Sequence, residues 1–303
     1  MFDSVYMSQA RLMLRCIPEI SKYDFLSLKG GTAINFFIRA LPRLSIDIDL
    51  TYILLDSRQS ALGNIDLAIR GVAHGCRQRI PGARIDLKVT EGMANRLSIS
   101  SDNATIKIEI NTVLRGSVFP SERRDLCDVA QNHFELYTSI SCMSFPDLFA
   151  GKICAALDRQ HPRDYFDVML LLENEGISDK LRQAFVAYLI SSPRPIHELL
   201  APHIIDIRET FHNQFSGMER LRIPLNRLLK IQQTLPEIMR DLLTDNDKLF
   251  LVSVMEEKPQ WDLMEIDHLQ RLPAVRWKLY NIQKMSPEKR HESLIHLKKV
   301  LEM

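Results

Sequence analysis

The spacing of apolar and polar residues divides the chain into a mixed first half and a helical second half. Residues 5–17 carry apolar side chains at helical spacing, and residues 58–79 form a longer helical pattern. Residues 25–28 and 46–53 have the composition and alternation of strands. Further strand-like runs follow at 84–90, 96–100 and 105–113. This order of elements predicts a mixed sheet combined with helices.

From residue 144 onward, helical periodicity continues almost to the end of the chain. A break within this half is indicated by Pro193, Pro195 and Pro202. The 303 residues suffice for two domains of roughly 150 residues each. We therefore predict an α/β (α+β) protein, with a mixed-sheet domain at 1–143 and a mainly helical domain at 144–303.

A glycine turn and an Asp-Ile-Asp strand carry the clearest chemical signal. Gly30 and Gly31 precede a predicted helix at 32–40, whose start Thr32 is expected to cap. Fifteen residues after Thr32, Asp47 and Asp49 alternate along a strand, so both carboxylates face the same side. Paired carboxylate oxygens suit Mg²⁺, and a glycine turn at a helix start suits phosphate. Together they indicate a site for a metal-bound nucleoside triphosphate.

A third carboxylate is expected from another strand, because two-metal nucleotidyl transfer needs ligands on both the nucleophile and the leaving-group side. Residues 105–111 alternate so that Lys107, Glu109 and Asn111 share one face. Glu109 is therefore a candidate third metal ligand. The same pattern also fits a polar residue on a solvated sheet face.

The sequence Gly-Gly-Thr, a short helix, Asp-Ile-Asp and a later strand with Glu109 resembles the signature of DNA polymerase β-type nucleotidyltransferases. The resemblance implies that backbone amides at Gly30, Gly31 and Thr32 bind the triphosphate. It also implies that Asp47, Asp49 and Glu109 hold the metal ions.

A second motif narrows the resemblance. Lys152, followed by Ala-Ala-Leu-Asp-Arg and then by Arg163-Asp164-Tyr-Phe-Asp167, resembles a stretch of the AbiEii/AbiGii toxin family, which includes the MenT toxins. The resemblance implies that Lys152 and Asp167 join Asp47 and Asp49 as catalytic residues, with Lys152 also contacting the nucleotide. If Glu109 faces solvent, Asp167 supplies the third carboxylate. For Arg163, a phosphate contact and a helix-stabilising ion pair are both open.

The family resemblance implies a magnesium-dependent toxin of a type IV toxin–antitoxin, or phage-defence, system. Such a toxin transfers NMP from an NTP to an acceptor, here expected to be the 3′ end of tRNA, and has an AbiEi-like antitoxin as its partner. Three alternatives remain. The same site modifies a protein or a small molecule such as an antibiotic, the chain is a nucleotide-binding module that does not transfer, or it is a structural or interaction protein that retains only the fold.

Composition narrows the class of protein. A net charge of +1 excludes a strongly basic nucleic-acid binder, although residues 270–299 are locally basic and fit either an RNA contact or a solvated helical face. The five cysteines are scattered and form no CxxC, which argues against a disulfide framework or a structural zinc site. No apolar run has the length of a membrane span. We therefore expect a cytoplasmic protein without a membrane segment.

Overall fold

The computed structural model describes residues 2–90 and 92–303 of the chain. These residues divide into two compact units. The first contains the residues up to Ser144 together with Phe215–Ile223, and the second contains Phe145–Gln214 and Pro224–Met303. The main segment of the first unit ends at Ser144, and the predicted division into domains at 143/144 stays a prediction. A short segment far along the sequence also belongs to the first unit.

The first unit is built on a mixed sheet whose seven described strands run in the order β3-β4-β5-β2-β1-β7-β6. Most neighbours are antiparallel, while β2 pairs with β5 and β1 with β7 in parallel. The strands are β1 (Leu26–Lys29), β2 (Asp47–Tyr52), β3 (Arg84–Thr90), β4 (Met93–Ser101), β5 (Ala104–Asn111), β6 (Glu122–Asp125) and β7 (Ser139–Cys142).

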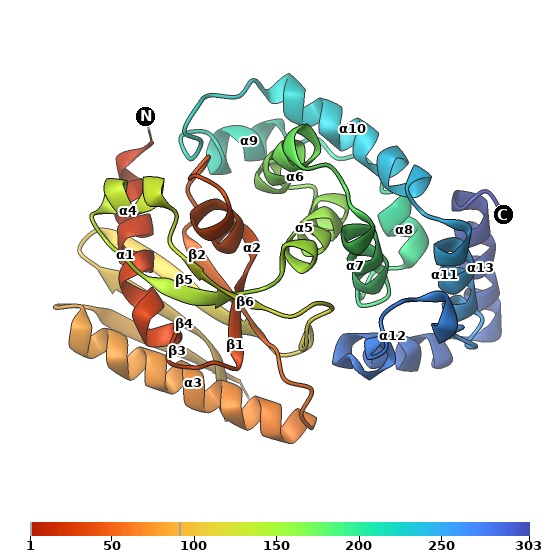
Figure 1. The fold of residues 1–303 in the computed structure, drawn as a ribbon, viewed down its shortest axis with the longest axis horizontal. Coiled ribbons are helices and arrows are strands. Elements are labelled where there is room, and N and C mark those ends of the chain that lie inside the picture. Colours follow the sequence, from red (N-terminus) through yellow and green to blue (C-terminus); the bar gives the residue numbers. More distant parts are fainter. Residues whose placement is uncertain (1, 91) are drawn as a thin grey trace. The chain divides into compact units, whose positions relative to one another are not determined.

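Two long helices, α1 (Ser4–Ile20) and α3 (Arg58–Arg79), pack on this sheet and on each other (Figure 1). The sheet contributes alternate apolar residues to the core, including Ile48, Ile108 and Leu97, which are register partners and fully buried. Because side chains alternate across a strand, the residues between them point to the other face. The polar positions of β2 and β5 therefore form one surface, as predicted.

The chain reverses direction after β1 in a glycine turn that leads into helix α2 (Gly30–Thr32) and a π-helical segment, η1 (Ala33–Ile38). η1 is nearly all buried, and the Asn35 side-chain amide donates to the carbonyl of Gly31 at 2.9 Å. The short helix α4 (Asp128–Phe134) lies between β6 and β7. Helix α2 packs against β2.

The second unit is helical. Its α-helices are α5 (Phe145–Arg159), α6 (Pro162–Asn174), α7 (Asp179–Leu189), α8 (Ile196–Leu200), α9 (Arg208–Gln214), α10 (Leu225–Asp241), α11 (Asp245–Met255), α12 (Pro273–Gln283) and α13 (Pro287–Val300). Side-chain caps begin several of them, for example Ser178 at α7 and a capping box between Thr244 and Asp247 at α11. The core forms where α5 packs on α6 and α7 (Figure 1).

The fold class predicted from sequence is confirmed: a mixed sheet with helices precedes a helical region. The predicted helix 58–79 and strand 84–90 match the observed bounds. The predicted helix at 32–40 instead begins at Gly30 and continues as a π-helix. Within residues 2–90 and 92–303, no helix combines the length and the apolar character that crossing a membrane requires.

Candidate active site

The glycine turn brings backbone close to charged side chains. Gly30 has a φ of +71°, a left-handed conformation that L side chains rarely adopt. A Cβ placed on Gly30 would lie 3.0 Å from Oδ2 of Asp49. A Cβ on Gly31 would lie 2.6 Å from Nη2 of Arg43 and 3.0 Å from the hydroxyl of Ser45. Gly30 therefore requires glycine because of its left-handed backbone, and at Gly31 a side chain would have to displace the buried guanidinium of Arg43.

Thr32 locks this turn to strand β2. Its hydroxyl donates to the backbone carbonyl of Asp47 at 2.5 Å and lies 3.0 Å from the Ser45 hydroxyl. The expectation that Thr32 caps the helix is wrong, since the helix begins at Gly30 and its N-cap, Lys29, makes no side-chain cap bond. Thr32 is also buried. What the turn offers to an anion is thus backbone N–H groups, which have no intrahelical partner at a helix start.

The two aspartates of β2 lie on the polar face beside this turn. Asp49 is the register partner of Lys29 on β1 and of Glu109 on β5, so these three side chains form one row across the sheet. Asp47 occupies the next row, opposite Lys107. Both aspartates are half-buried.

Glu109 is already engaged by a cation. Nη2 of Arg96, on β4, lies 2.6 Å from Oε2 of Glu109, and both side chains are about two-fifths exposed, at 39% and 40%. The bond to Glu109 and its charge, with a smaller contribution from Asp49, raise the pKa of Arg96 above its ordinary value. The guanidinium therefore neutralises the carboxylate that the sequence predicted as the third metal ligand.

The donor set of the sheet fits a hard divalent cation. Asp47 and Asp49 supply carboxylate oxygens on one face, and the close approach of Asp49 to Gly30 leaves no room for another side chain there. No group of three or more His, Cys, Asp or Glu in metal-binding geometry occurs among the described residues. Mg²⁺ commonly binds through one or two carboxylates, with water and substrate phosphates completing its octahedron. Two aspartates beside a phosphate-binding turn satisfy that requirement.

A second cluster of charged residues lies within the helical unit. Nζ of Lys152, on α5, lies 2.9 Å from Oδ1 of Asp164 and 3.1 Å from Oδ2 of Asp167, both on α6. Asp164 and Asp167 are fully buried, and Lys152 is 6% exposed. Arg159 adds two bonds to Asp164, at 2.6 and 2.9 Å. The predicted residues Lys152 and Asp167 are thus direct partners in one buried network.

The charges of this network are balanced. Burial alone would raise the pKa of Asp164, but the charges of Lys152 and Arg159 and their hydrogen bonds outweigh it and hold the pKa well below its usual range. Asp164 is therefore ionised at neutral pH. Arg159 keeps 59% of its side chain exposed. The arginine thus extends this buried network to the surface, where an anion can reach it.

The start of helix α6 is held by His161. Its Nδ1 accepts a hydrogen bond from the backbone N–H of Arg163 at 3.1 Å, and its Nε2 lies 3.1 Å from Oε1 of Gln214. Burial, reinforced by the charge of Arg163, lowers the pKa of His161 to about 4. The neutral ring can accept this bond, and the imidazolium cannot. His161 thereby orients the turn that carries Arg163 and Asp164.

Three residues of these clusters were missed by sequence reasoning: Arg43, Arg96 and His161. Arg159 was part of the second motif, but the sequence assigned it no role. Arg43 is 1% exposed and donates to the carbonyl of Leu44 at 2.8 Å. The burial of Arg43 could not be predicted, because a single arginine two residues before Ser45 has no periodic pattern. The pair of Arg96 with Glu109 could not be predicted either, because it depends on the register of two strands. His161 had a detectable signal, because it precedes Pro162 at a helix start.

Comparison with known protein families gives the class of this protein, a nucleotidyltransferase. A sequence model described as nucleotidyl transferase AbiEii toxin, type IV TA system, matches residues 11–279. The chain therefore belongs to the AbiEii family of nucleotidyltransferase toxins, and the family resemblance seen in the sequence is confirmed.

A solved structure supports the same fold. The chain is similar to MenT4, a nucleotidyltransferase toxin of Mycobacterium tuberculosis, with a TM-score of 0.55 and 14% sequence identity. The match covers 98% of this chain and 92% of MenT4. No curated protein matches the sequence. At this identity the likeness to MenT4 concerns the fold.

Proposed function

We propose that this toxin transfers NMP from an NTP to an RNA acceptor, the 3′ end of tRNA, and releases pyrophosphate. The observation that carries the proposal is the approach of Asp49 to Gly30, which sets a carboxylate 3.0 Å from where a glycine side chain would begin. A phosphate held by backbone N–H groups of the turn would therefore lie next to the carboxylates of Asp47 and Asp49. No side chain at the turn would separate the phosphate from them.

The proposed metal is Mg²⁺, held by Asp47 and Asp49. When bound, it would neutralise phosphate charge and stabilise the attacking and leaving oxygens. The residues of the chain bind and orient the nucleotide. Backbone amides at Gly30, Gly31 and Thr32 hold the phosphates, and the buried guanidinium of Arg43 beside Gly31 adds positive charge to the turn.

The proposed reaction is an in-line displacement. A hydroxyl oxygen of the acceptor forms a bond to the α-phosphorus while the bond to the β-phosphate oxygen breaks. The hydroxyl proton passes to a strand carboxylate or to solvent, and pyrophosphate leaves. We assign the proton-accepting carboxylate to Asp47 or Asp49, because both side chains lie half-buried on the polar face of the sheet.

We further propose that Lys152 and Asp167 of the helical unit are catalytic residues, as are Asp47 and Asp49, and that Arg163 contacts the nucleotide. Two observations support it. The family match spans both units, from residue 11 to residue 279, and Lys152 and Asp167 are direct partners at 3.1 Å. The exposed guanidinium of Arg159 gives the same cluster a cation at the surface.

The family also implies biological context. As a member of a type IV toxin–antitoxin family, the chain is proposed to act in the cytoplasm, to arrest growth by modifying tRNA, and to be neutralised by an AbiEi-like antitoxin. We also propose a role in phage defence.

Labelling with α-³²P NTPs tests the acceptor. Each NTP is incubated with the toxin and, separately, with total tRNA, with mixed protein and with an aminoglycoside. Label on tRNA that disappears with Asp49→Asn supports the proposal. Label found only on protein or on the drug would show that the acceptor is not tRNA. NTP binding without any labelled product would indicate a non-catalytic module.

A further inference from the structure

Helix α12 presents two stacked aromatic rings to solvent. Trp277 and Tyr280 have ring centroids 5.6 Å apart and an interplanar angle of 21°. Trp277 is 54% exposed and Tyr280 is 49% exposed. Residues three apart on a helix share a face, so the two rings form one ledge on the surface of α12. Exposed neighbouring aromatic surface of this kind is typical of a binding site.

One cation contacts this ledge, and two others lie near it in the sequence. Nζ of Lys284 lies 5.4 Å from the centroid of the Tyr280 ring, in a cation–π contact. Arg271 and Arg276 are also exposed. No acidic residue occurs between Asp267 and Glu288 in the sequence. Among the described residues, Arg271, Arg276 and Lys284 form no ion pair, so their charges remain available to an anionic partner.

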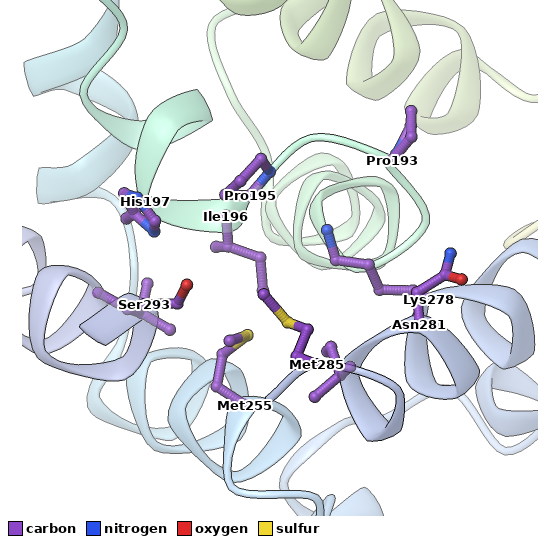
Figure 2. A pocket seen from close by; sticks show the side chains of 11 residues that line it. Pro193, Pro195, Ile196, His197, Met255, Lys278, Asn281, Met285 and Ser293 are labelled. Carbon is purple, nitrogen blue, oxygen red and sulfur yellow. The ribbon is translucent and has the colours of Figure 1, made fainter. Parts of the chain in front are cut away.

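The opposite side of α12 is fixed to the rest of the helical unit. Lys278 is buried, and its Nζ donates to the backbone carbonyls of Ser192 at 2.9 Å and Arg194 at 2.5 Å. Figure 2 shows Lys278 among the side chains that line a neighbouring cavity of about 140 Å³, together with Met255 and Met285. The clamp by Lys278 holds the helix, so the aromatic ledge is presented on a rigid support.

We propose that Trp277 and Tyr280, with Arg276 and Lys284, form a platform on which unpaired bases of single-stranded RNA stack. Aromatic rings accept any base through its π face, while neighbouring cations contact the phosphates. The absence of carboxylates from 268–287 favours an anionic strand over a protein surface of mixed charge. The identity of the RNA as the acceptor strand rests on the proposed function, but the stacking surface does not.

The chain offers an internal reporter for this platform. Trp261 and Trp277 are its two tryptophans, and Trp261 packs against Phe250 with centroids 5.6 Å apart. Trp261→Phe keeps an aromatic ring at that contact and leaves Trp277 as the single tryptophan. A short unstructured RNA is titrated into this full-length variant without NTP, while tryptophan fluorescence is followed at several salt concentrations.

Stacking is expected to quench Trp277 fluorescence in a saturable manner. Tyr280→Ala should weaken binding by about 10- to 100-fold, the range typical of one base–aromatic stack. Arg276→Gln with Lys284→Gln should lower the slope of log affinity against log salt by about 0.7 for each lost phosphate contact. Tyr137→Ala and Lys180→Gln, exposed residues on other elements, are the matched controls and should leave affinity unchanged.

Three results would overturn the inference. The first is an unchanged Trp277 signal while the toxin labels tRNA, which would leave the proposed function standing. The second is equal quenching by duplex RNA, whose bases are not free to stack. The third is quenching by a co-expressed antitoxin but not by RNA, which would make α12 a protein-docking surface. RNA-dependent quenching without nucleotidyl transfer would support the platform and contradict the proposed function.

Discussion

Arg96 and Glu109 form a cross-strand ion pair, with Nη2 of the arginine 2.6 Å from Oε2 of the glutamate. Glu109 stands beside Asp49 in the sheet register, where the sequence placed a third metal ligand. The carboxylates of Glu109 and Asp49 therefore lie in different environments. Glu109 is neutralised by the guanidinium of Arg96, whereas Asp49 faces the glycine turn. Glu109 as a metal ligand stays a prediction, and substitution decides it.

We expect Asp49→Asn to reduce nucleotidyl transfer by at least about 100-fold, as loss of a central electrostatic group in an active site does. Glu109→Gln should reduce transfer by less than about tenfold, because Arg96 already compensates its charge. Transfer rates at saturating Mg²⁺ measure both effects. Equal losses in the two variants would show that Glu109 holds metal after releasing Arg96.

Gly31→Ala should damage the site, and Gly63→Ala should not. A Cβ on Gly31 meets Nη2 of buried Arg43 at 2.6 Å, and forced overpacking of this kind costs about 1–3 kcal/mol. A Cβ on Gly63, in α3, meets nothing within 4 Å, and alanine favours a helix over glycine. The melting temperature and the transfer rate should fall for Gly31→Ala and stay unchanged or rise for Gly63→Ala. Similar melting and activity in both variants would argue against the close approach of Arg43.

The stability of the cluster formed by Lys152, Arg159, Asp164 and Asp167 should depend more on its buried side chains than on the exposed Arg159. Asp164→Asn removes the partner of both Lys152 and Arg159, and breaking a buried ion pair costs about 3–5 kcal/mol. Arg159→Gln alters a side chain that is 59% exposed and leaves Lys152 beside the buried Asp164, so it should cost less than Asp164→Asn. Denaturant unfolding measures both. A larger loss from Arg159→Gln would contradict the assigned network.

Acid should destabilise the protein through His161. Its pKa is lowered to about 4 in the fold, against an ordinary value near 6.5, so the unfolded chain binds more protons between these values. The contribution of His161 to stability is therefore complete above about pH 6.5 and is lost as pH falls toward 4. His161→Asn keeps a cap acceptor without titrating, and should flatten the pH dependence of unfolding. An unchanged slope would show that His161 is not responsible.

Periodicity was sufficient to predict the elements that carry the sheet-side candidate residues. Helix α3 matched its predicted bounds because apolar residues recur along it at helical spacing, and β5 was recognised because buried isoleucines alternate with Lys107 and Glu109. Two strands of four residues were missed: β6 contains only charged residues, and β7 has a single large apolar residue, Ile140, whereas β1, which is equally short, was predicted. The π-helical turn after Gly30 was also missed, because side-chain spacing does not reveal which backbone groups bond.

The candidate site was predictable as residue types but not as contacts. Asp47 and Asp49 follow from alternation on one strand, whereas the bond from Thr32 to the carbonyl of Asp47 depends on how a helix start meets that strand. The pairing of Lys152 with Asp164 and Asp167 depends on the packing of α5 against α6. Sequence spacing on a single helix cannot specify a partner on the next.

Parallel labelling with α-³²P and γ-³²P NTP tests nucleotidyl transfer most directly. We predict that wild-type toxin places the α label on tRNA, releases the γ label as pyrophosphate in equal amount, and loses both products with Asp49→Asn. Transfer of the γ label to the acceptor, or α labelling that survives Asp49→Asn, would contradict the site described here.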